Sequence, residues 1–152
     1  MTRSPPDLKL RLKGLYAITD QQLITEEQFQ MAIEAALQGG VSIIQYRDKS
    51  DDRNKRLRQA GILRSLCQQY GAISIINDDI ELAQAVEADG VHIGKEDQSL
   101  KQAREALGED AIIGVSCYND IGLALAAENN SADYVAFGTM FSSPTKPDAV
   151  MA

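Results

Sequence analysis

The sequence predicts an α/β fold of the TIM (β/α)8-barrel type, with about six βα units present in the chain. Short apolar runs alternate with single helical patterns, and parallel strands are the ones that need such helical crossovers. Polar residues follow nearly every apolar run, at the end of a parallel sheet where βα proteins bind ligands. The first run is followed by Thr19-Asp20-Gln21-Gln22 instead of the glycine-rich phosphate loop of a doubly wound sheet, which favours a barrel.

The first βα unit follows a polar, proline-containing segment over residues 1–14, which we expect to be a flexible lead-in. Residues 15–19 are predicted to form the first strand. Thr25 and Gln28 have the spacing of a capping box, and the apolar residues that follow recur at helical spacing as far as Gly39-Gly40. The sequence therefore predicts a helix that begins near Thr25 and ends at the two glycines.

The remaining units repeat this alternation of strand and helix. Ser99 and Gln102 have the spacing of a second capping box. The apolar runs are nearly continuous, which is typical of strands covered on both faces. The predicted strands lie at residues 41–45, 72–76, 90–93, 111–115 and 134–137, and the predicted helices at residues 53–70, 79–87, 99–107 and 119–129.

The length of 152 residues is short for a closed eight-stranded barrel, since even compact barrels take about 200 residues. We therefore expect residues 15–152 to form one partial (β/α) barrel domain that lacks the last two βα units, as in a C-terminally truncated chain. Open strand edges favour association, so a homo-oligomer is considered among the partners.

Composition excludes several classes of function. The net charge of −7 disfavours nucleic acid as a partner. No apolar run approaches the roughly 20 residues of a membrane span, and the first residues lack the apolar core of a signal peptide. Cys67 and Cys117 have no spacing that suggests a disulfide framework or a zinc site. We expect a cytoplasmic protein with reduced thiols and no membrane partner.

The clearest chemical pattern leaves the strand predicted at residues 41–45. Gln45, Arg47 and Lys49 are spaced two apart, so in an extended chain their side chains share one face. An amide, a planar guanidinium and a mobile ammonium together suit a phosphate or pyrophosphate. The alternative is a solvated basic turn whose cations pair with Asp48 or Asp51.

Carboxylates follow the next two strands. Asp78 comes after the strand at 72–76, and Asp97 comes after the strand at 90–93. Two such carboxylates suit Mg²⁺, which takes one or two protein oxygens and completes its octahedron with water and substrate phosphates. The alternatives are that Asp78 or Asp79 caps the next helix and that Asp97 is a surface turn acid.

Three further features are weaker signals. His92, the only histidine, lies within a predicted strand and is interpreted as a structural, hydrogen-bonded imidazole. Ser116 ends a strand and could donate to a phosphate or a ring nitrogen, the alternative being a helix-entry hydroxyl. Residues 142–146, with hydroxyls, a proline and a lysine, are a candidate second anion site.

Taken in order, five motifs closely resemble those of thiamine-phosphate synthases, and the resemblance runs from about Leu15 to the last residue. That family is a (β/α)8 barrel that joins an aminopyrimidine pyrophosphate to a thiazole phosphate, or its carboxylate, and releases pyrophosphate. The resemblance implies a transferase of thiamine biosynthesis with these small molecules as substrates and Mg²⁺ as cofactor. The motifs are Gln45-Tyr46-Arg47-Asp48-Lys49, Asn77-Asp78, Asp89 to Gly94 with Asp97, Gly114 to Ser116, and Ser143-Pro144-Thr145-Lys146.

The resemblance also implies roles for individual residues. Arg47, Lys49 and Lys146 would be the catalytic cations, while Asp78 and Asp97 would hold Mg²⁺. Family members often carry Thr where this chain has Ser143, and they supply glycine-rich phosphate loops after the last two strands, beyond the last residue of this chain. The residues implied to contact substrate are Gln45, Tyr46, Arg47, Asp48, Lys49, Asn77, Ser116, Ser143, Pro144, Thr145 and Lys146.

The implied mechanism is dissociative: pyrophosphate leaves with Mg²⁺ assistance, and the thiazole nitrogen attacks the resulting pyrimidine cation. It needs positioning and electrostatic stabilisation but no protein nucleophile. Two alternatives stay open. A thiazole tautomerase would not need Asp78 and Asp97, and it would carry a catalytic histidine where this chain has Cys117-Tyr118. A non-catalytic phosphate-binding barrel fragment is the other.

Overall fold

The computed structural model describes residues 9, 11–94 and 99–141. It confirms the predicted alternation of strands and helices, and the largest difference is at β5, which continues to Tyr118 instead of ending at residue 115. No described helix combines the length and apolarity that a bilayer crossing requires. The elements are β1 (Leu15–Ile18), α2 (Glu26–Gln38), β2 (Val41–Tyr46), α3 (Arg53–Tyr70), β3 (Ile73–Asn77), α4 (Ile80–Ala85), β4 (Gly90–Ile93), α5 (Leu100–Leu107), β5 (Ile112–Tyr118), α6 (Ile121–Asn129) and β6 (Tyr134–Phe137).

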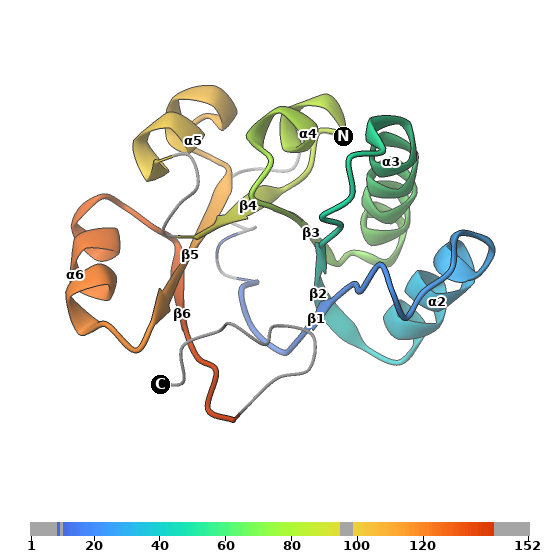
Figure 1. Cartoon of the computed structure of the whole chain (residues 1–152), viewed down its shortest axis with the longest axis horizontal. Helices are drawn as coiled ribbons and strands as arrows, with labels where there is room; N and C mark the ends of the chain where they lie inside the picture. The colour runs from blue at the N-terminus through green and yellow to red at the C-terminus, as the bar shows by residue number, and fades with distance from the viewer. Residues whose placement is uncertain (1–8, 10, 95–98, 142–152) are drawn as a thin grey trace.

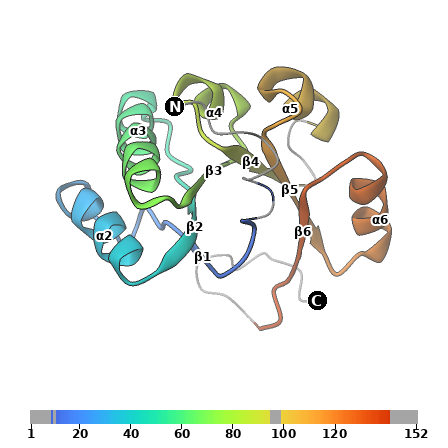
Figure 2. The same ribbon diagram turned by 180° about the vertical axis from the view of Figure 1, so that it is seen from behind.

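The strands form one sheet of six, in the order β1-β2-β3-β4-β5-β6, and every neighbouring pair is parallel. The sheet is curled, and helices α2 to α6 lie along its convex side (Figures 1 and 2). A doubly wound sheet would reverse its strand order and carry helices on both faces. The structure therefore confirms a curled parallel sheet with alternating helices and excludes the doubly wound alternative.

Apolar side chains fill both faces of the sheet. On the convex side, Ile44 and Ile76 pack with helix residues such as Leu63 in the larger core cluster. On the concave side, a smaller cluster joins Ile43, Ile73, Ile75 and Ile112, with Leu12, Tyr16 and Tyr134 packed against it. Because side chains alternate along a strand, burial on both faces requires nearly continuous apolar runs, as this sequence has.

Aspartates stabilise the sheet at the amino ends of its strands. Asp89, just before β4, accepts hydrogen bonds from the backbone N–H and the hydroxyl of Ser74, both at 2.9 Å. Asp133, just before β6, accepts from the N–H of Ile113 at 2.8 Å and forms an ion pair with Arg104 at 2.9 Å. Each carboxylate thus joins the start of one strand to its neighbour, at the end of the sheet opposite the polar turns.

The helix caps agree with the sequence in part. Ser99 and Gln102 form the predicted capping box at the start of α5. The capping box predicted at Thr25 is wrong: Thr25 is the N-cap of α2 but makes no side-chain capping bond. The pKa of the exposed Glu27 carboxyl is lowered, first by its own backbone N–H and then by the Thr25 side chain.

Candidate functional site

A cavity of about 660 Å³ opens on the concave side of the sheet, at the carboxyl ends of the strands. Its polar wall combines residues from five strands, and its apolar wall comes largely from β6 and the residues after it. The polar lining residues are Tyr16, Gln45, His92, Ser116, Tyr118 and Tyr134, and the apolar ones include Ile18, Val135, Phe137 and Phe141.

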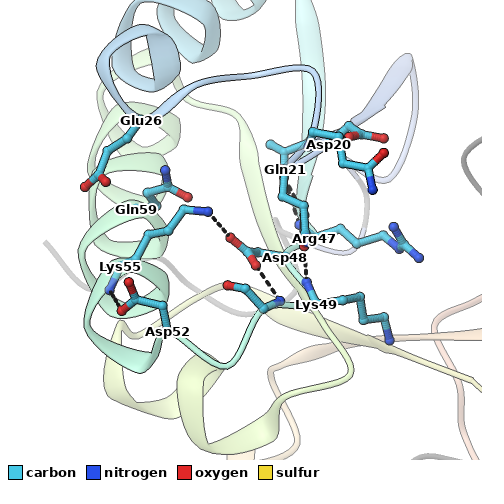
Figure 3. Close-up of polar contacts among 12 residues, drawn as sticks. Asp20, Gln21, Glu26, Arg47, Asp48, Lys49, Asp52, Lys55 and Gln59 are labelled. Carbon is cyan, nitrogen blue, oxygen red and sulfur yellow. Dashed lines mark hydrogen bonds and ion pairs between the residues drawn. The ribbon is translucent and has the colours of Figure 1, made fainter.

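The turn after β2 divides its side chains between two directions, as the period-two spacing predicts. Arg47 and Lys49 point to the same side, whereas the Asp48 carboxylate points toward Lys55 of α3 (Figure 3). Gln45, two residues earlier, faces the cavity. Among the residues that the structure describes, the Arg47 guanidinium has no ion-pair partner, so it can accept an anion.

Residues of the turn after β1 hold the backbone of this cationic turn. The hydroxyl of Thr19 accepts a hydrogen bond from the N–H of Arg47 at 2.8 Å, and the side-chain oxygen of Gln21 accepts one from the N–H of Lys49. Thr19 itself is buried. This supporting role was not predicted from the sequence, although polar residues directly after a strand were the signal for it.

Tyr46 and Asp48, implied to contact substrate, lie on the other side of β2, against α3. The Tyr46 hydroxyl donates to the side-chain oxygen of Gln59 at 3.0 Å, and the Asp48 carboxylate pairs with Lys55 at 2.8 Å. Both side chains are buried. The structure therefore does not bring their side chains together with those of Gln45, Arg47 and Lys49. Asp48 also does not pair with Arg47 or Lys49, as the alternative of a salt-bridged basic turn required.

The Asp48 carboxylate gives a prediction for stability against pH. Its burial acts to raise its pKa, but hydrogen bonds from Lys55 and Ser50 outweigh that effect and hold the pKa below the usual value. A lowered folded-state pKa stabilises the protein above the unfolded-state pKa, and this stabilisation is lost as the pH falls through the folded-state pKa. We expect Asp48→Asn to lower the free energy of unfolding by about 2 kcal/mol near neutral pH and by progressively less below about pH 4. Urea denaturation of both proteins across this pH range checks it, and a deficit independent of pH would contradict it.

Asn77, Asp78 and Lys49 meet directly at the ends of β2 and β3. The Asn77 amide donates to Asp78 Oδ2 at 2.7 Å, and the Lys49 ammonium pairs with the same oxygen. Asp78 has a positive φ of 63°, a conformation that Asp adopts more readily than most residues, and its N–H donates to the carbonyl of His92 at 2.8 Å. Asp79, not Asp78, caps α4, so the helix-cap alternative is wrong for Asp78.

The donor set fits Mg²⁺ in its chemistry. Within residues 9, 11–94 and 99–141, no group of three His, Cys, Asp or Glu side chains could hold a metal. Mg²⁺ does not need such a group, because it commonly binds one or two carboxylates and keeps waters or phosphate oxygens as its other ligands. Asp78 supplies one carboxylate beside the cationic turn, while the other predicted ligand, Asp97, lies outside the described residues.

His92 is hydrogen-bonded on both ring nitrogens, as its structural interpretation predicted. Nδ1 lies 3.0 Å from the Tyr134 hydroxyl and Nε2 lies 2.8 Å from the Ser116 hydroxyl. Ser116 lies within β5, and α6 is capped by Asp120, so the alternative of a helix-entry hydroxyl is wrong. Burial raises the pKa of Tyr134 and of Tyr16, which keeps both hydroxyls protonated at neutral pH.

The predicted anion loop is not described by the structure. Ser143, Pro144, Thr145 and Lys146 lie outside the described residues. The structure instead adds two residues that sequence reasoning missed, Tyr16 and Tyr134, which line the cavity. Their signal in the sequence is an aromatic hydroxyl in an otherwise apolar strand.

Comparison with known proteins matches this chain to one family over most of its length. The family model described as "Thiamine monophosphate synthase" matches residues 15–152. The thiamine-phosphate synthases of Nitrosococcus oceani and Halorhodospira halophila are 51% and 49% identical, over 93% of this chain and 65% and 66% of their own lengths. A solved structure, thiamine phosphate pyrophosphorylase from Pyrococcus furiosus, superposes with a TM-score of 0.81 at 36% identity, over 95% of this chain and 66% of that one. The chain thus spans about two thirds of the length of these relatives.

Proposed function

The chain belongs to the thiamine monophosphate synthase family, and from this premise we propose that it carries the pyrophosphate and pyrimidine half of a thiamine-phosphate synthase site. The whole enzyme is a transferase that joins an aminopyrimidine pyrophosphate to a thiazole phosphate and releases pyrophosphate. The observation that carries the proposal is that Lys49 and Asn77 both contact the Asp78 carboxylate beside Arg47, next to a cavity with polar groups on its inner wall.

The proposal includes the finer fold. In the whole protein, the curled sheet closes into a TIM (β/α)8 barrel, of which the described residues supply six strands. Support comes from the sequential strand order, the helices on the convex side and the superposition on a longer relative. The active site then lies at the carboxyl ends of the strands, where Gln45, Asn77 and Ser116 are found.

The cationic turn binds the leaving pyrophosphate. The Arg47 fork can engage two phosphate oxygens at once, and the Lys49 ammonium adds a mobile positive charge. The Lys49 ammonium pairs with Asp78 in this structure. An incoming anion therefore competes with the Asp78 carboxylate for an ammonium that is already positioned at the site. Lys146, outside the described residues, completes the proposed pyrophosphate contacts, and Ser143 to Thr145, also outside them, would contact the thiazole phosphate.

The chemistry needs no protein nucleophile. When the carbon–oxygen bond of the pyrimidine substrate breaks, its electron pair leaves with pyrophosphate, and Arg47 and Lys49 stabilise that negative charge. Mg²⁺ held by Asp78 and Asp97 would supply further neutralisation of the leaving group. The thiazole nitrogen then forms the new bond to the pyrimidine carbon, while Gln45 and Ser116 hold the ring in place.

Titration calorimetry of the 152-residue chain with inorganic pyrophosphate, with and without Mg²⁺, tests the proposal. We expect binding that strengthens when Mg²⁺ is present, and Arg47→Gln should weaken it on the order of tenfold, because a bidentate charged contact is lost. Arg53→Gln is the matched control, since Arg53 is an exposed cation on α3 whose ion-pair partner among the described residues is Glu81, at 3.9 Å. Equal effects of the two variants, or no binding to a chain that circular dichroism shows to be folded, would contradict the proposed site.

A further inference from the structure

Five side chains from five strands form one continuous hydrogen-bond chain along the cavity wall. The Gln45 amide donates to the Tyr16 hydroxyl at 2.8 Å, and that hydroxyl lies 2.8 Å from the hydroxyl of Tyr134. The Tyr134 hydroxyl is hydrogen-bonded to Nδ1 of His92 at 3.0 Å, and Nε2 of His92 is hydrogen-bonded to the Ser116 hydroxyl at 2.8 Å. The two ends of the chain, Gln45 and Ser116, are the groups assigned above to the pyrimidine ring.

The direction of the first bond sets the direction of the others. An amide nitrogen can only donate, so Tyr16 accepts from Gln45 and has one hydrogen left for Tyr134. Tyr134 then donates to Nδ1 of His92, which makes His92 the neutral tautomer with its proton on Nε2. The Nε2–H group then donates a hydrogen bond to the Ser116 oxygen. The reverse direction would leave the Tyr16 hydroxyl proton without an acceptor among the described residues.

We propose that His92 and Tyr134 are positioning residues that present Ser116 as a hydrogen-bond donor, and Gln45 as an acceptor, to the ring in the cavity. Ser116 accepts a hydrogen bond from His92, so its own hydroxyl hydrogen is available to the ligand. The side-chain nitrogen of Gln45 donates to Tyr16, so its side-chain oxygen is available to accept a hydrogen bond from the ligand. A ring with a nitrogen acceptor beside an amino donor fits the Ser116 donor and the Gln45 acceptor. The inference rests on the proposed function and specifies how that site selects an aminopyrimidine.

Gly114 provides the space that Tyr134 occupies. A Cβ atom at position 114 would lie 2.0 Å from the Tyr134 ring and 2.4 Å from its hydroxyl oxygen. Any larger residue in this position of β5 would therefore displace the ring. Tyr134 also packs edge-on against Tyr16, with 5.9 Å between ring centroids. The hydroxyl is thus held where it can reach both Tyr16 and His92.

The tautomer of His92 can be measured directly, because it is the only histidine in the chain. Nitrogen-15 NMR of the ligand-free 152-residue chain, labelled at histidine, should show one neutral imidazole with a directly bonded proton on Nε2 and none on Nδ1. Tyr134→Phe should change the Nδ1 shift, because it removes the donor to that atom. A proton on Nδ1 would mean that His92 donates to Tyr134 instead of accepting from it. This result would overturn the inference. This result does not depend on any substrate.

Comparing the binding of two ligands distinguishes a positioning role of Tyr134 and His92 from a merely structural one. Calorimetry with the aminopyrimidine pyrophosphate should show about tenfold weaker binding for Tyr134→Phe and for Gly114→Ala, a loss typical of one misdirected hydrogen bond. Affinity for inorganic pyrophosphate should stay within about twofold of the unmodified chain, because pyrophosphate does not use the ring site. Equal losses for both ligands, or no loss for either, would overturn the inference. If the unmodified chain binds pyrophosphate but not the aminopyrimidine compound, the proposed function fails while the tautomer measurement still stands.

Discussion

Asp78→Ala is expected to remove the Mg²⁺-dependent part of pyrophosphate binding, on the order of a 100-fold loss of affinity in the presence of the metal. Asp78 is the one predicted metal carboxylate that the structure describes, and it lies beside Lys49 and Asn77 at the anion site. Removing a carboxylate from a site with one or two protein ligands leaves too few donors to hold the metal. Calorimetry at fixed pyrophosphate with increasing Mg²⁺ measures the loss.

The same variant should behave differently without the metal. Asp78→Ala then removes a negative charge next to Lys49, so pyrophosphate should bind at least as tightly as it does to the unmodified chain. Asp51→Ala is the matched control, since Asp51 is an exposed carboxylate on the loop after β2. If Asp78→Ala keeps the full response to Mg²⁺, or if Asp51→Ala loses it as well, Asp78 is not the metal ligand.

Asp133→Ala is expected to lower the free energy of unfolding by about 3 kcal/mol, as is typical when one partner of a buried ion pair is removed. The Asp133 and Arg104 side chains are only 8% and 12% exposed, and their ion pair is 2.9 Å long. Lys9 approaches the other carboxylate oxygen at 2.8 Å, and the N–H of Ile113 donates at 2.8 Å. The substitution leaves the Arg104 cation buried without its carboxylate, and it leaves the start of β5 without its acceptor.

Urea denaturation of Asp133→Ala measures this loss. Asp110→Ala is the control, because Asp110 is an exposed carboxylate just before β5, at the same end of the sheet. Pyrophosphate affinity of the folded Asp133→Ala protein should be unchanged, since the carboxylate lies at the amino ends of the strands and the candidate site lies at their carboxyl ends. A loss of stability no larger than that of Asp110→Ala would show that this network contributes little.

Short-range spacing in the sequence was sufficient for the strands and for the cationic turn. Runs such as residues 43–46 are buried on both faces, so they identify strands without any tertiary information. The period of two likewise places Gln45, Arg47 and Lys49 on one side of β2, because an extended chain alternates its side chains whatever surrounds it. These predictions depend only on backbone geometry.

Spacing was not sufficient for residues whose role depends on a distant partner. The sequence could not distinguish Asp78 from Asp79 as the cap of α4, because that depends on where β3 ends and how the chain turns. The motif Gln45 to Lys49 suggested five binding residues, yet Tyr46 and Asp48 face Gln59 and Lys55 of α3. The alternation of side chains that places Gln45, Arg47 and Lys49 on one side directs Tyr46 and Asp48 toward α3 on the other side.

The sequence by itself determined the order of strands and helices, the polar turns after the strands and the membership of the family. Only the tertiary structure decided which polar groups meet. Tyr16 and Tyr134 are 118 positions apart, and their hydroxyls lie 2.8 Å from each other because the curling of the sheet lets side chains of β1 and β6 meet on the wall of one cavity. The physical reason is that side-chain direction is a local property of the backbone, whereas contact across a curved sheet depends on strand register and on every strand between the two residues.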